Sequence, residues 1–391
     1  MKTRVICAVI VLVLGANAVS FVAQCSAEEP KEKGQAACAA EANQAAPIEH
    51  VIVYGKPGMF CGWPANNGAW IWDGKEIAVG FSLRPYVEKE GHNAASGGRS
   101  VLARSLDGGE TWTLEDPDNF VDDGGTTTPS PGGINFAHPG FAMRLHRSDG
   151  IRFFISYDRG RKWQGPYAFA DLMSHPEFEG LENTARTDYI VNGPDDCFIF
   201  MSARKPDTGT RDRAFLAQTK DGGKTFNFVS WINPEPVGTT RGAMPSTVRI
   251  SKTRLVSALR RKYPDQWIDV FVSNDNGQSW KFLSKVADTG GWNGNPPALA
   301  RLKDGRLCCA YGNRSKRKML AKYSSDDGAT WGDEIVLRDD FKVDSFDDPD
   351  FGYPRLVQRA DGRLVAMYYW ATKENPHHHI AATIWDPDKT K

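Results

Sequence analysis

The sequence lacks the features that would place it in several common protein classes. Its 391 residues carry 48 basic and 48 acidic side chains, so a broad nucleic-acid footprint or a polybasic membrane patch is not expected. The seven cysteines form no C-x-x-C pair, which argues against a zinc knuckle or a redox motif. A hydrolase elbow, a P-loop and a dinucleotide fingerprint are also absent. We therefore expect no cofactor, and no motif indicates a metal site.

The N-terminus has the pattern of an export signal. Two cations precede an apolar run from Val5 to Leu14, and Ala16-Asn17-Ala18 offers a small-residue cleavage site. The run is too short to favour a membrane-spanning helix. We predict a signal peptide over 1–27, a disordered linker over 28–48 that is rich in Ala, Glu, Gln and Lys, and a secreted or periplasmic protein. A lipid anchor at Cys25 is the alternative.

One pattern recurs five times, roughly fifty to sixty residues apart. It reads Ser/Thr-x-Asp-x-Gly-x-Thr-Trp with small variations, and its copies are Ser105–Trp112, Ser156–Trp163, Thr219–Phe226, Ser273–Trp280 and Ser324–Trp331. The spacing predicts a hairpin turn, because Asp bonds nearby backbone amides and Gly takes a positive φ. The hydroxyl adds a local bond, and the aromatic ring packs back on the sheet.

These segments resemble the Asp-boxes, or BNR repeats, of the sialidase superfamily, and the resemblance spans residues 49 to 386. It implies an all-β, six-bladed β-propeller over 49–391, whose boxes hold turns and carry no chemistry. Only three strand-like runs follow the fifth box. The isolated run His50-Val51-Ile52-Val53-Tyr54 would complete their sheet, and a ring closed in this way leaves no exposed edges.

The functional pocket is expected on the face opposite the box turns, around the axis. Five of the predicted loops into the innermost strands contain a proline. Together with the preceding residue, these prolines are Trp63-Pro64, His138-Pro139, Met244-Pro245, Pro296-Pro297 and Tyr353-Pro354. A proline at a strand's first residue removes no ladder bond, so these prolines are read as architectural. The exits of the second strands carry arginines, namely Arg84, Arg204, Arg260-Arg261, Arg314 and, just beyond, Arg317. Because guanidinium suits carboxylate, sulfate or phosphate, we expect an acidic carbohydrate as substrate.

The resemblance assigns roles to some of these residues. Sialidases hold the substrate carboxylate with three arginines and use a tyrosine nucleophile, a glutamate that activates it, and an aspartate acid/base. Tyr353 matches the nucleophile, and Arg260 and Arg317 match the second and third arginines. Gly62 stands where the first arginine belongs, and Met244 stands near the place of the glutamate. Cleavage of sialic acid itself is therefore not the favoured reaction.

Other residues are candidates for the missing groups. Glu88, Glu90 and His92 follow Arg84, where the acid/base is expected, and Asp348 and Asp350 lie close to Tyr353 in sequence. Arg355 lies two residues beyond Tyr353, so it should share a strand face with the phenol and lower its pKa. We predict a catalytic set of Tyr353, Asp350, His92 and Asp188. The predicted substrate-binding set is Arg260, Arg317, Arg84, Arg186, Arg314, Arg355 and Trp63. Asp188 has a second reading, as the structural partner of Arg186.

Three functions remain open at this point. The leading one is a glycoside hydrolase, and the second is a polysaccharide lyase in which Tyr353 or a histidine removes the proton α to a uronate carboxylate. The third is a glycan-binding propeller without catalysis, in which Trp63, Trp70, Trp292 and Trp370 stack on sugars. Two carboxyl groups about 5 Å or about 6.5–9.5 Å apart near Tyr353 would favour a carboxylate-pair hydrolase.

The remaining expectations concern histidines and assembly. His138 and the run His377-His378-His379 are placed on the pocket face. The run is read as exposed loop decoration, with a bound divalent cation as the alternative. We expect a monomer that has no membrane contact beyond the export signal.

Overall fold

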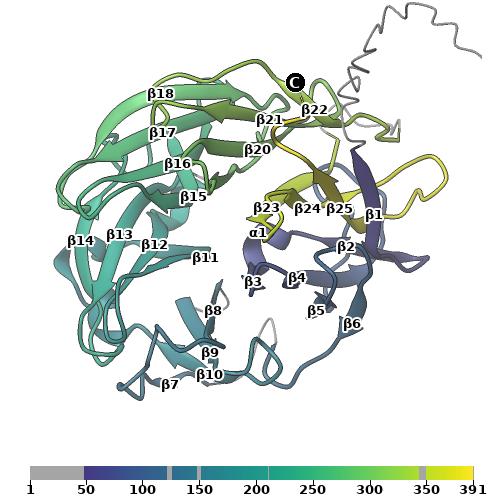
Figure 1. The fold of residues 1–391 in the computed structure, drawn as a ribbon. Coiled ribbons are helices and arrows are strands. Elements are labelled where there is room, and N and C mark those ends of the chain that lie inside the picture. Colours follow the sequence, from purple (N-terminus) through teal and green to yellow (C-terminus); the bar gives the residue numbers. More distant parts are fainter. Residues whose placement is uncertain (1–47, 121–125, 148–150, 210, 343–348, 391) are drawn as a thin grey trace, which may run out of the picture. The chain divides into compact units, whose positions relative to one another are not determined.

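The structure is a computed structural model of the chain and describes residues 48–120, 126–147, 151–209, 211–342 and 349–390. Six sheets surround a central axis as the blades of a β-propeller (Figure 1). The predicted fold class is confirmed. The predicted signal peptide and linker lie outside the described residues, except for Ile48 at the end of the linker.

Four blades follow the expected four-stranded plan or a close variant of it. Blade one contains β2 (Met59–Gly62), β3 (Ala69–Trp72), β4 (Glu76–Pro85), β5 (Arg99–Ser105) and β6 (Thr113–Glu115). Blade three contains β11 (Glu182–Val191), β12 (Cys197–Arg204), β13 (Arg213–Thr219) and β14 (Asn227–Trp231). Blade four contains β15 (Arg241–Arg249), β16 (Leu255–Lys262), β17 (Trp267–Ser273) and β18 (Lys281–Asp288). Blade five contains β19 (Ala298–Arg301), β20 (Leu307–Asn313), β21 (Lys318–Ser324) and β22 (Ile335–Arg338).

Blade six joins the two ends of the described chain. It contains β23 (Gly352–Gln358), β24 (Leu364–Trp370), β25 (His379–Trp385) and β1 (Glu49–Tyr54), the last paired antiparallel with β25. The apolar residues of β1 pack with those of β25 in one cluster. The N-terminal strand therefore closes the ring, as the isolated run in the sequence predicted.

Blade two departs from the plan. Its antiparallel strands are β8 (Ala142–Arg147), β9 (Ile151–Ser156) and β10 (Gln164–Ala168), and the short β7 (Thr128–Pro129) lies on their outer edge. Because β9 leads into an Asp-box, β8 is the blade's second strand, and an innermost strand is missing among the described residues. His138 precedes β8 and makes an edge-to-face contact with Tyr157 of the box turn, with ring centroids 5.2 Å apart. Its predicted place on the pocket face is therefore wrong.

A short helix and a buried arginine fill the centre beside blade two. Helix α1 (Pro64–Asn67) interrupts the innermost strand of blade one and packs against β8, β11 and β23. The side chain of Arg144, on β8, is fully buried. It donates to Asn67 Oδ1 at 2.6 Å and to Ser100 Oγ at 2.8 Å, and its guanidinium carbon lies 4.2 Å from the centre of the Phe120 ring. One side chain thus links α1, β5 and β8.

Replacing Arg144 by alanine is expected to lower the free energy of unfolding by about 3 kcal/mol, because the change opens a cavity and removes buried hydrogen bonds. Urea unfolding followed by tryptophan fluorescence measures the loss. Arg161→Ala is the control, since Arg161 is 47 % exposed and should cost less than about 0.5 kcal/mol. Equal losses in the two variants would refute the central role of Arg144.

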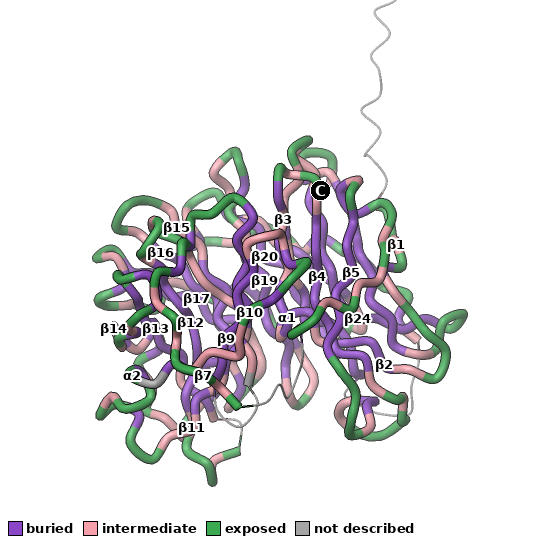
Figure 2. The backbone as a smooth tube through the Cα atoms, turned by 90° about the horizontal axis from the view of Figure 1, so that it is seen from below, coloured by how far each residue is buried: buried purple, intermediate pink, exposed green. Residues whose placement is uncertain are grey.

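The five Asp-boxes form the predicted turns. In each box the Ser or Thr hydroxyl accepts a hydrogen bond from the amide of the Gly four residues later, at 2.7–2.9 Å. In the first box, Asp107 Oδ1 also accepts from the Thr111 amide at 2.9 Å. The remaining helical pieces are α2 (Ala170–Met173) and two 3-10 turns over Pro176–Phe178 and Pro206–Thr208. The blades are buried through most of their length, and exposed residues collect in the loops at both ends (Figure 2).

Candidate functional site

Three of the repeated prolines follow a residue with an unusual backbone. Trp63, Met244 and Tyr353 have φ of 61°, 54° and 51°. A positive φ is costly for a residue with a side chain and persists only where the surroundings enforce it. The ladders of β15 and β23 shift register at these points, between Ala243/Ser246 and Gly352/Arg355. As a result the side chains of Met244 and Tyr353 leave the strand alternation and join one cluster, against which Trp63 packs.

The Tyr353 phenol is the centre of this cluster and is 5 % exposed. Its backbone amide donates to Asn295 Oδ1 at 2.9 Å. Its hydroxyl oxygen accepts a hydrogen bond from Arg260 Nη1 at 2.9 Å. The Asn295 side chain leaves no room for a Cβ at position 352, where the φ of +103° also suits only glycine. The backbone of Tyr353 is therefore fixed from both sides.

The charges around Tyr353 favour its ionised form. Burial by itself raises the pKa of a phenol, but the positive charges of Arg260, His92 and Arg314 outweigh it and lower the pKa of Tyr353 to about 7. Arg260 is fully buried and directs its other donors to the carbonyl oxygens of Asn293 and Gly294, at 2.6–3.0 Å. These bonds hold the guanidinium against the phenol oxygen. Tyr353 is thus prepared as a nucleophile or a base near neutral pH.

His92 and Asp350 form an acid/base pair beside the phenol. The Nδ1 atom of His92 lies 2.7 Å from Asp350 Oδ1, and the imidazole and Tyr353 ring centroids are 5.9 Å apart. Burial disfavours the imidazolium, but the carboxylate of Asp350 raises the pKa of His92 above its ordinary value. The His92 side chain remains 34 % exposed, and Nε2 is the nitrogen left for proton exchange. The carboxylate thus favours the imidazolium form of a side chain that remains partly exposed.

Asp350 is surrounded by hydrogen-bond donors and positive charge. Its carboxylate accepts from the Asn93 amide at 2.9 Å and from the Tyr369 hydroxyl, and it lies 3.7 Å from Arg314 Nη2. Although its burial opposes ionisation, the charge and the hydrogen bond of His92, together with the charges of His378 and Arg314, hold the pKa of Asp350 far below its usual range. The largest contributions to the pKa shift of Tyr353 come from burial and from cations, and no carboxylate is among them. Among the described residues these contributions therefore give no sign of the carboxylate pair that most glycosidases use.

Two further predicted site residues, Arg355 and Asp188, interact with each other. Arg355 bonds the carbonyl oxygens of Ala65 and Thr187, and its charge acts on Asp188. It is not among the charges that shift the pKa of Tyr353, because the bulge between Gly352 and Arg355 breaks the strand alternation. The expected effect of Arg355 on the phenol is therefore wrong. Burial raises the pKa of Asp188 to about 7, and the charge of Arg355 and hydrogen bonds with Thr247 partly offset this rise. The arginine that acts on Asp188 is therefore Arg355, whereas the sequence suggested Arg186.

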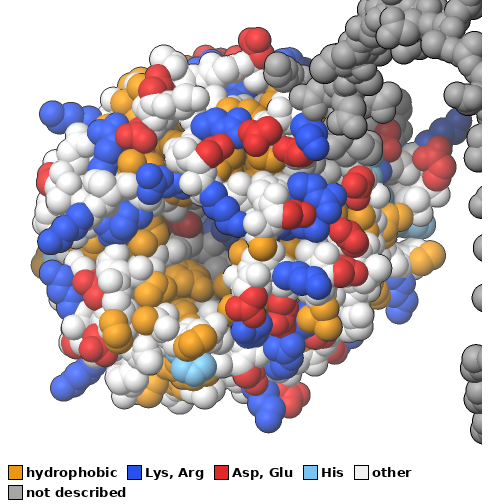
Figure 3. Space-filling model, in the orientation of Figure 1, with side chains coloured by type: hydrophobic (Ala, Val, Ile, Leu, Met, Phe, Trp, Pro, Cys, Tyr) orange, Lys and Arg blue, Asp and Glu red, His pale blue; other side chains and the backbone are white. Residues whose placement is uncertain are grey.

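The predicted arginines lie in different surroundings. Arg260 is buried, and its donors are taken by the Tyr353 hydroxyl and by backbone carbonyl oxygens. Arg314, also buried, is the arginine that reaches Asp350, whereas Arg317 lies half-buried in the turn that follows. Arg84 and Arg186 are half-buried, and the guanidinium carbon of Arg84 lies 5.5 Å from the Trp63 ring centre. Figure 3 shows a face that is hollowed near its centre, with Lys and Arg side chains beside the hollow.

The histidine run and the tryptophans also differ from expectation. His378 is buried, and its Nε2 lies 2.5 Å from the Asp350 carbonyl oxygen, while His379 is buried too. Reading the run as exposed decoration is therefore wrong. Among the described residues, no group of three His, Cys, Asp or Glu side chains is arranged to hold a metal ion. Trp70 and Trp370 are buried and cannot stack on a sugar, whereas Trp292 is 53 % exposed.

Several residues of the site escaped the sequence prediction. Tyr369 bonds Asp350, Asn293 and Asn295 hold Arg260 and Tyr353, and Arg241 adds its charge to the field on the phenol. The pairing of Tyr369 with Gly352 follows from the hairpin register and was accessible in principle. The two asparagines belong to the loop between blades four and five, which its prolines marked as an entry to an innermost strand, but no pattern indicated what their side chains contact.

The pKa of Tyr353 makes a prediction that needs no substrate. In a pH titration of tyrosinate absorbance, one tyrosine should ionise near pH 7, well below the others. Tyr353→Phe should remove this transition. Arg314→Met should move it to higher pH, because a positive charge that favours the phenolate is lost. A transition that survives in Tyr353→Phe would assign the ionisation elsewhere.

These features define the class of protein. Six blades, five Asp-boxes and closure by the N-terminal strand make this a β-propeller of the sialidase-like superfamily. A model of the BNR repeat-like domain matches residues 150–366, and the chain belongs to that family. A comparison with curated protein sequences gave no match.

Solved structures share the fold at low sequence identity. A protein of unknown function from Dyadobacter fermentans is 21 % identical, with a TM-score of 0.65 over 86 % of this chain and 98 % of its own. The α-L-arabinanase of Penicillium chrysogenum, complexed with arabinobiose, is 12 % identical, with a TM-score of 0.59 over 88 % and 100 %. The NanB sialidase of Streptococcus pneumoniae is 9 % identical, with a TM-score of 0.54 over 88 % and 71 %. At these identities the likeness establishes the fold alone.

In the part of the chain that the structure describes, no helix combines the length and the apolar character that crossing a bilayer requires.

Proposed function

We propose that this protein is a glycoside hydrolase that cleaves a glycosidic bond of an acidic sugar, with Tyr353 as nucleophile and His92 as general acid. One observation carries the proposal. The phenol and the imidazole are neighbours whose pKa values are shifted in opposite directions, with Tyr353 lowered to about 7 and His92 raised. The two shifts favour a phenolate and an imidazolium side by side, which supplies a nucleophile and a proton donor.

The proposed reaction uses these two groups in sequence. The Tyr353 phenolate attacks the anomeric carbon, the glycosidic C–O bond breaks, and the His92 imidazolium protonates the departing oxygen. Neutral His92 then takes a proton from water, the water oxygen attacks the anomeric carbon, and the bond to the Tyr353 oxygen breaks. Arg260 stabilises the phenolate at both ends of the cycle through its 2.9 Å hydrogen bond. Asp350 holds His92 in place and stabilises its charged form.

The charge balance supports an acidic sugar. The cations Arg260, Arg314 and His92 face two anions, the Asp350 carboxylate and the phenolate, so positive charge is in excess. In a partly closed site this excess attracts an anion. We propose that two half-buried arginines contact this anion. They are Arg84, at the end of β4, and Arg186, on β11. The fold is shared with an arabinanase as well as with a sialidase, so a neutral arabinose polymer is the natural comparator.

A lyase is the second candidate, and the single carboxylate at Tyr353 favours it. A lyase needs one base, one acid and a cation that stabilises the substrate carboxylate, and it needs no carboxylate pair. Tyr353 would remove the proton α to a uronate carboxylate, the C–O bond at the β carbon would break, and His92 would protonate the leaving oxygen. The product would carry a carbon–carbon double bond.

One screen tests both candidates. The purified protein is incubated with sialosides, uronate-containing polysaccharides, sulfated glycans and arabinan, while new reducing ends and the absorbance of unsaturated uronate are followed. The proposal predicts reducing ends from an acidic glycan without that absorbance. Reducing ends with the absorbance would establish the lyase, and cleavage of arabinan alone would refute the acidic substrate. Binding without any product would leave a glycan-binding propeller.

A further inference from the structure

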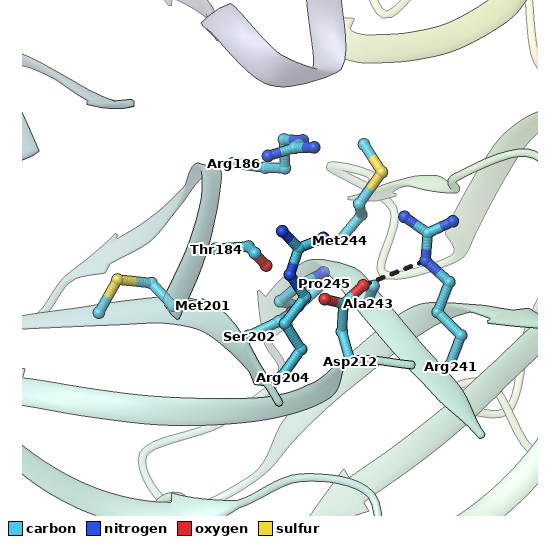
Figure 4. Close-up of a pocket in the computed structure, with 10 residues that line it drawn as sticks. All are labelled: Thr184, Arg186, Met201, Ser202, Arg204, Asp212, Arg241, Ala243, Met244 and Pro245. Carbon is cyan, nitrogen blue, oxygen red and sulfur yellow. Dashed lines mark hydrogen bonds and ion pairs between the residues drawn. The ribbon is translucent and has the colours of Figure 1, made fainter. Parts of the chain in front are cut away.

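We infer that the recess between blades three and four is a second sugar subsite, which takes the hydroxyl edge of a neutral sugar unit next to the one at Tyr353. The inference rests on the proposed function and extends it to the substrate's length. Ten residues line the recess, and its polar part comprises Thr184, Arg186, Ser202, Arg204, Asp212 and Arg241 (Figure 4).

The recess adjoins the catalytic centre through Met244. This residue lines the recess, and its sulfur lies 3.5 Å from Arg260 Nη1, the atom that donates to the Tyr353 oxygen. Arg241, on the other side of the recess, is one of the charges that lower the pKa of Tyr353. A ligand in the recess is therefore adjacent to a ligand held at the phenol, so one substrate can occupy both places.

Asp212 gives the recess an unused hydrogen-bond acceptor. The residue is 3 % exposed, and its Oδ2 accepts from Arg241 Nε at 3.2 Å. Its Oδ1 is buried and has no partner among the described residues. A buried carboxylate oxygen without a donor is costly, which points to a donor supplied by a ligand. In Figure 4, Thr184 and Arg204 lie beside this carboxylate, while Met201 turns away.

The charges of the recess suit hydroxyl groups better than a second anion. Arg241 is paired with Asp212, and Arg204 is paired with Glu182 at 2.9 Å, so each of these guanidinium groups already faces a carboxylate. A sugar hydroxyl both donates and accepts, and it therefore matches a carboxylate oxygen flanked by guanidinium and hydroxyl groups. The anionic unit belongs at Tyr353, where cations are in excess.

The size of the recess limits what enters it. Water-sized groups can occupy about 30 Å³ there. One such group needs roughly 10–15 Å³, so the recess admits about two of them. That is room for two neighbouring hydroxyls on the edge of a ring, with the ring itself outside. The substrate is thus at least a disaccharide, of one acidic and one neutral unit.

Binding to a protein that cannot turn over tests the subsite. Tyr353→Phe is titrated with the disaccharides sialylgalactose and glucuronosylxylose and with their acidic monosaccharides, and affinities are measured by calorimetry. We expect at least one disaccharide to bind about tenfold more tightly than its acidic monosaccharide, as one hydrogen bond to a charged group provides. Adding Asp212→Asn or Thr184→Val should reduce that gain to about twofold or less. Thr184→Val keeps the test valid if the Asp212 variant misfolds.

Asp269→Asn is the matched control. Asp269 is a buried carboxylate of blade four, 3.0 Å from Arg261, and does not line the recess, so the gain should persist. Equal gains with and without Asp212→Asn, or no gain for either disaccharide, would overturn the subsite. If the disaccharide binds more tightly than its monosaccharide but the wild type shows no cleavage that depends on Tyr353, the hydrolase proposal is refuted and the subsite is supported. Absence of any glycan binding would overturn both.

Discussion

Replacing Tyr353 by phenylalanine is expected to reduce kcat/KM on the cleaved glycan by about 10³-fold or more, because the nucleophile is removed. The ring remains, so the packing of the site around it should not change. The lost hydroxyl is the acceptor of Arg260 Nη1 and the group whose pKa falls to about 7. Initial rates on the substrate identified by the screen measure the effect.

Tyr368→Phe is the control for this change. Tyr368 is the neighbour of Tyr369 on β24, equally buried, and its hydroxyl lies 2.6 Å from Thr383 Oγ1 on the opposite face of the sheet. It should alter kcat/KM by less than about twofold, since the hydroxyl that it removes bonds Thr383 and not a residue of the site. If Tyr353→Phe kept at least a tenth of the wild-type rate with an unchanged pH profile, Tyr353 would not be the nucleophile.

Replacing His92 by glutamine is expected to lower kcat by about 10²- to 10⁴-fold on a substrate with an ordinary sugar leaving group. The reason is that no other described group at the phenol is set up to protonate the departing oxygen, since Asp350 is held ionised. A dinitrophenyl glycoside of the same sugar needs no protonation, so the defect should nearly disappear on it. The same loss on both substrates would exclude His92 as the general acid.

The Asp350→Asn variant tests how His92 is positioned. The Asp350 carboxylate raises the pKa of His92, so its removal lowers that pKa and imidazolium is lost at a lower pH. The alkaline limb of the rate profile should therefore move to lower pH. Asp340→Asn breaks a carboxylate contact with Arg338, 2.6 Å long, and should leave the limb in place. A lower rate with an unmoved limb would mean that Asp350 is only structural.

The architecture could be predicted because its sequence signals depend on residues close together in the chain. The boxes are hairpin turns whose bonds span four residues, such as that from the Gly109 amide to Ser105, so a short pattern specifies them completely. The isolated run at 50–54 had the apolar alternation of a strand, and only one sheet lacked a strand. The prediction for His138 was wrong because blade two has no innermost strand among the described residues. Its place is taken by α1 and by Arg144, which bonds Asn67, a residue 77 positions earlier in the chain.

The amino-acid sequence was enough to predict a propeller, its closure, and Tyr353, Asp350 and His92 as candidates, since each lies in a loop or at a strand end that the blade order carries to one end of the axis. Tertiary structure alone decided how these groups act. The register shift at Tyr353 turns its phenol toward Arg260 and leaves Arg355 with Asp188, although the spacing had placed Arg355 beside the phenol. The pair of His92 and Asp350 joins residues 258 positions apart. Electrostatic energies depend on distance in space and on burial, and both are properties of the assembled ring.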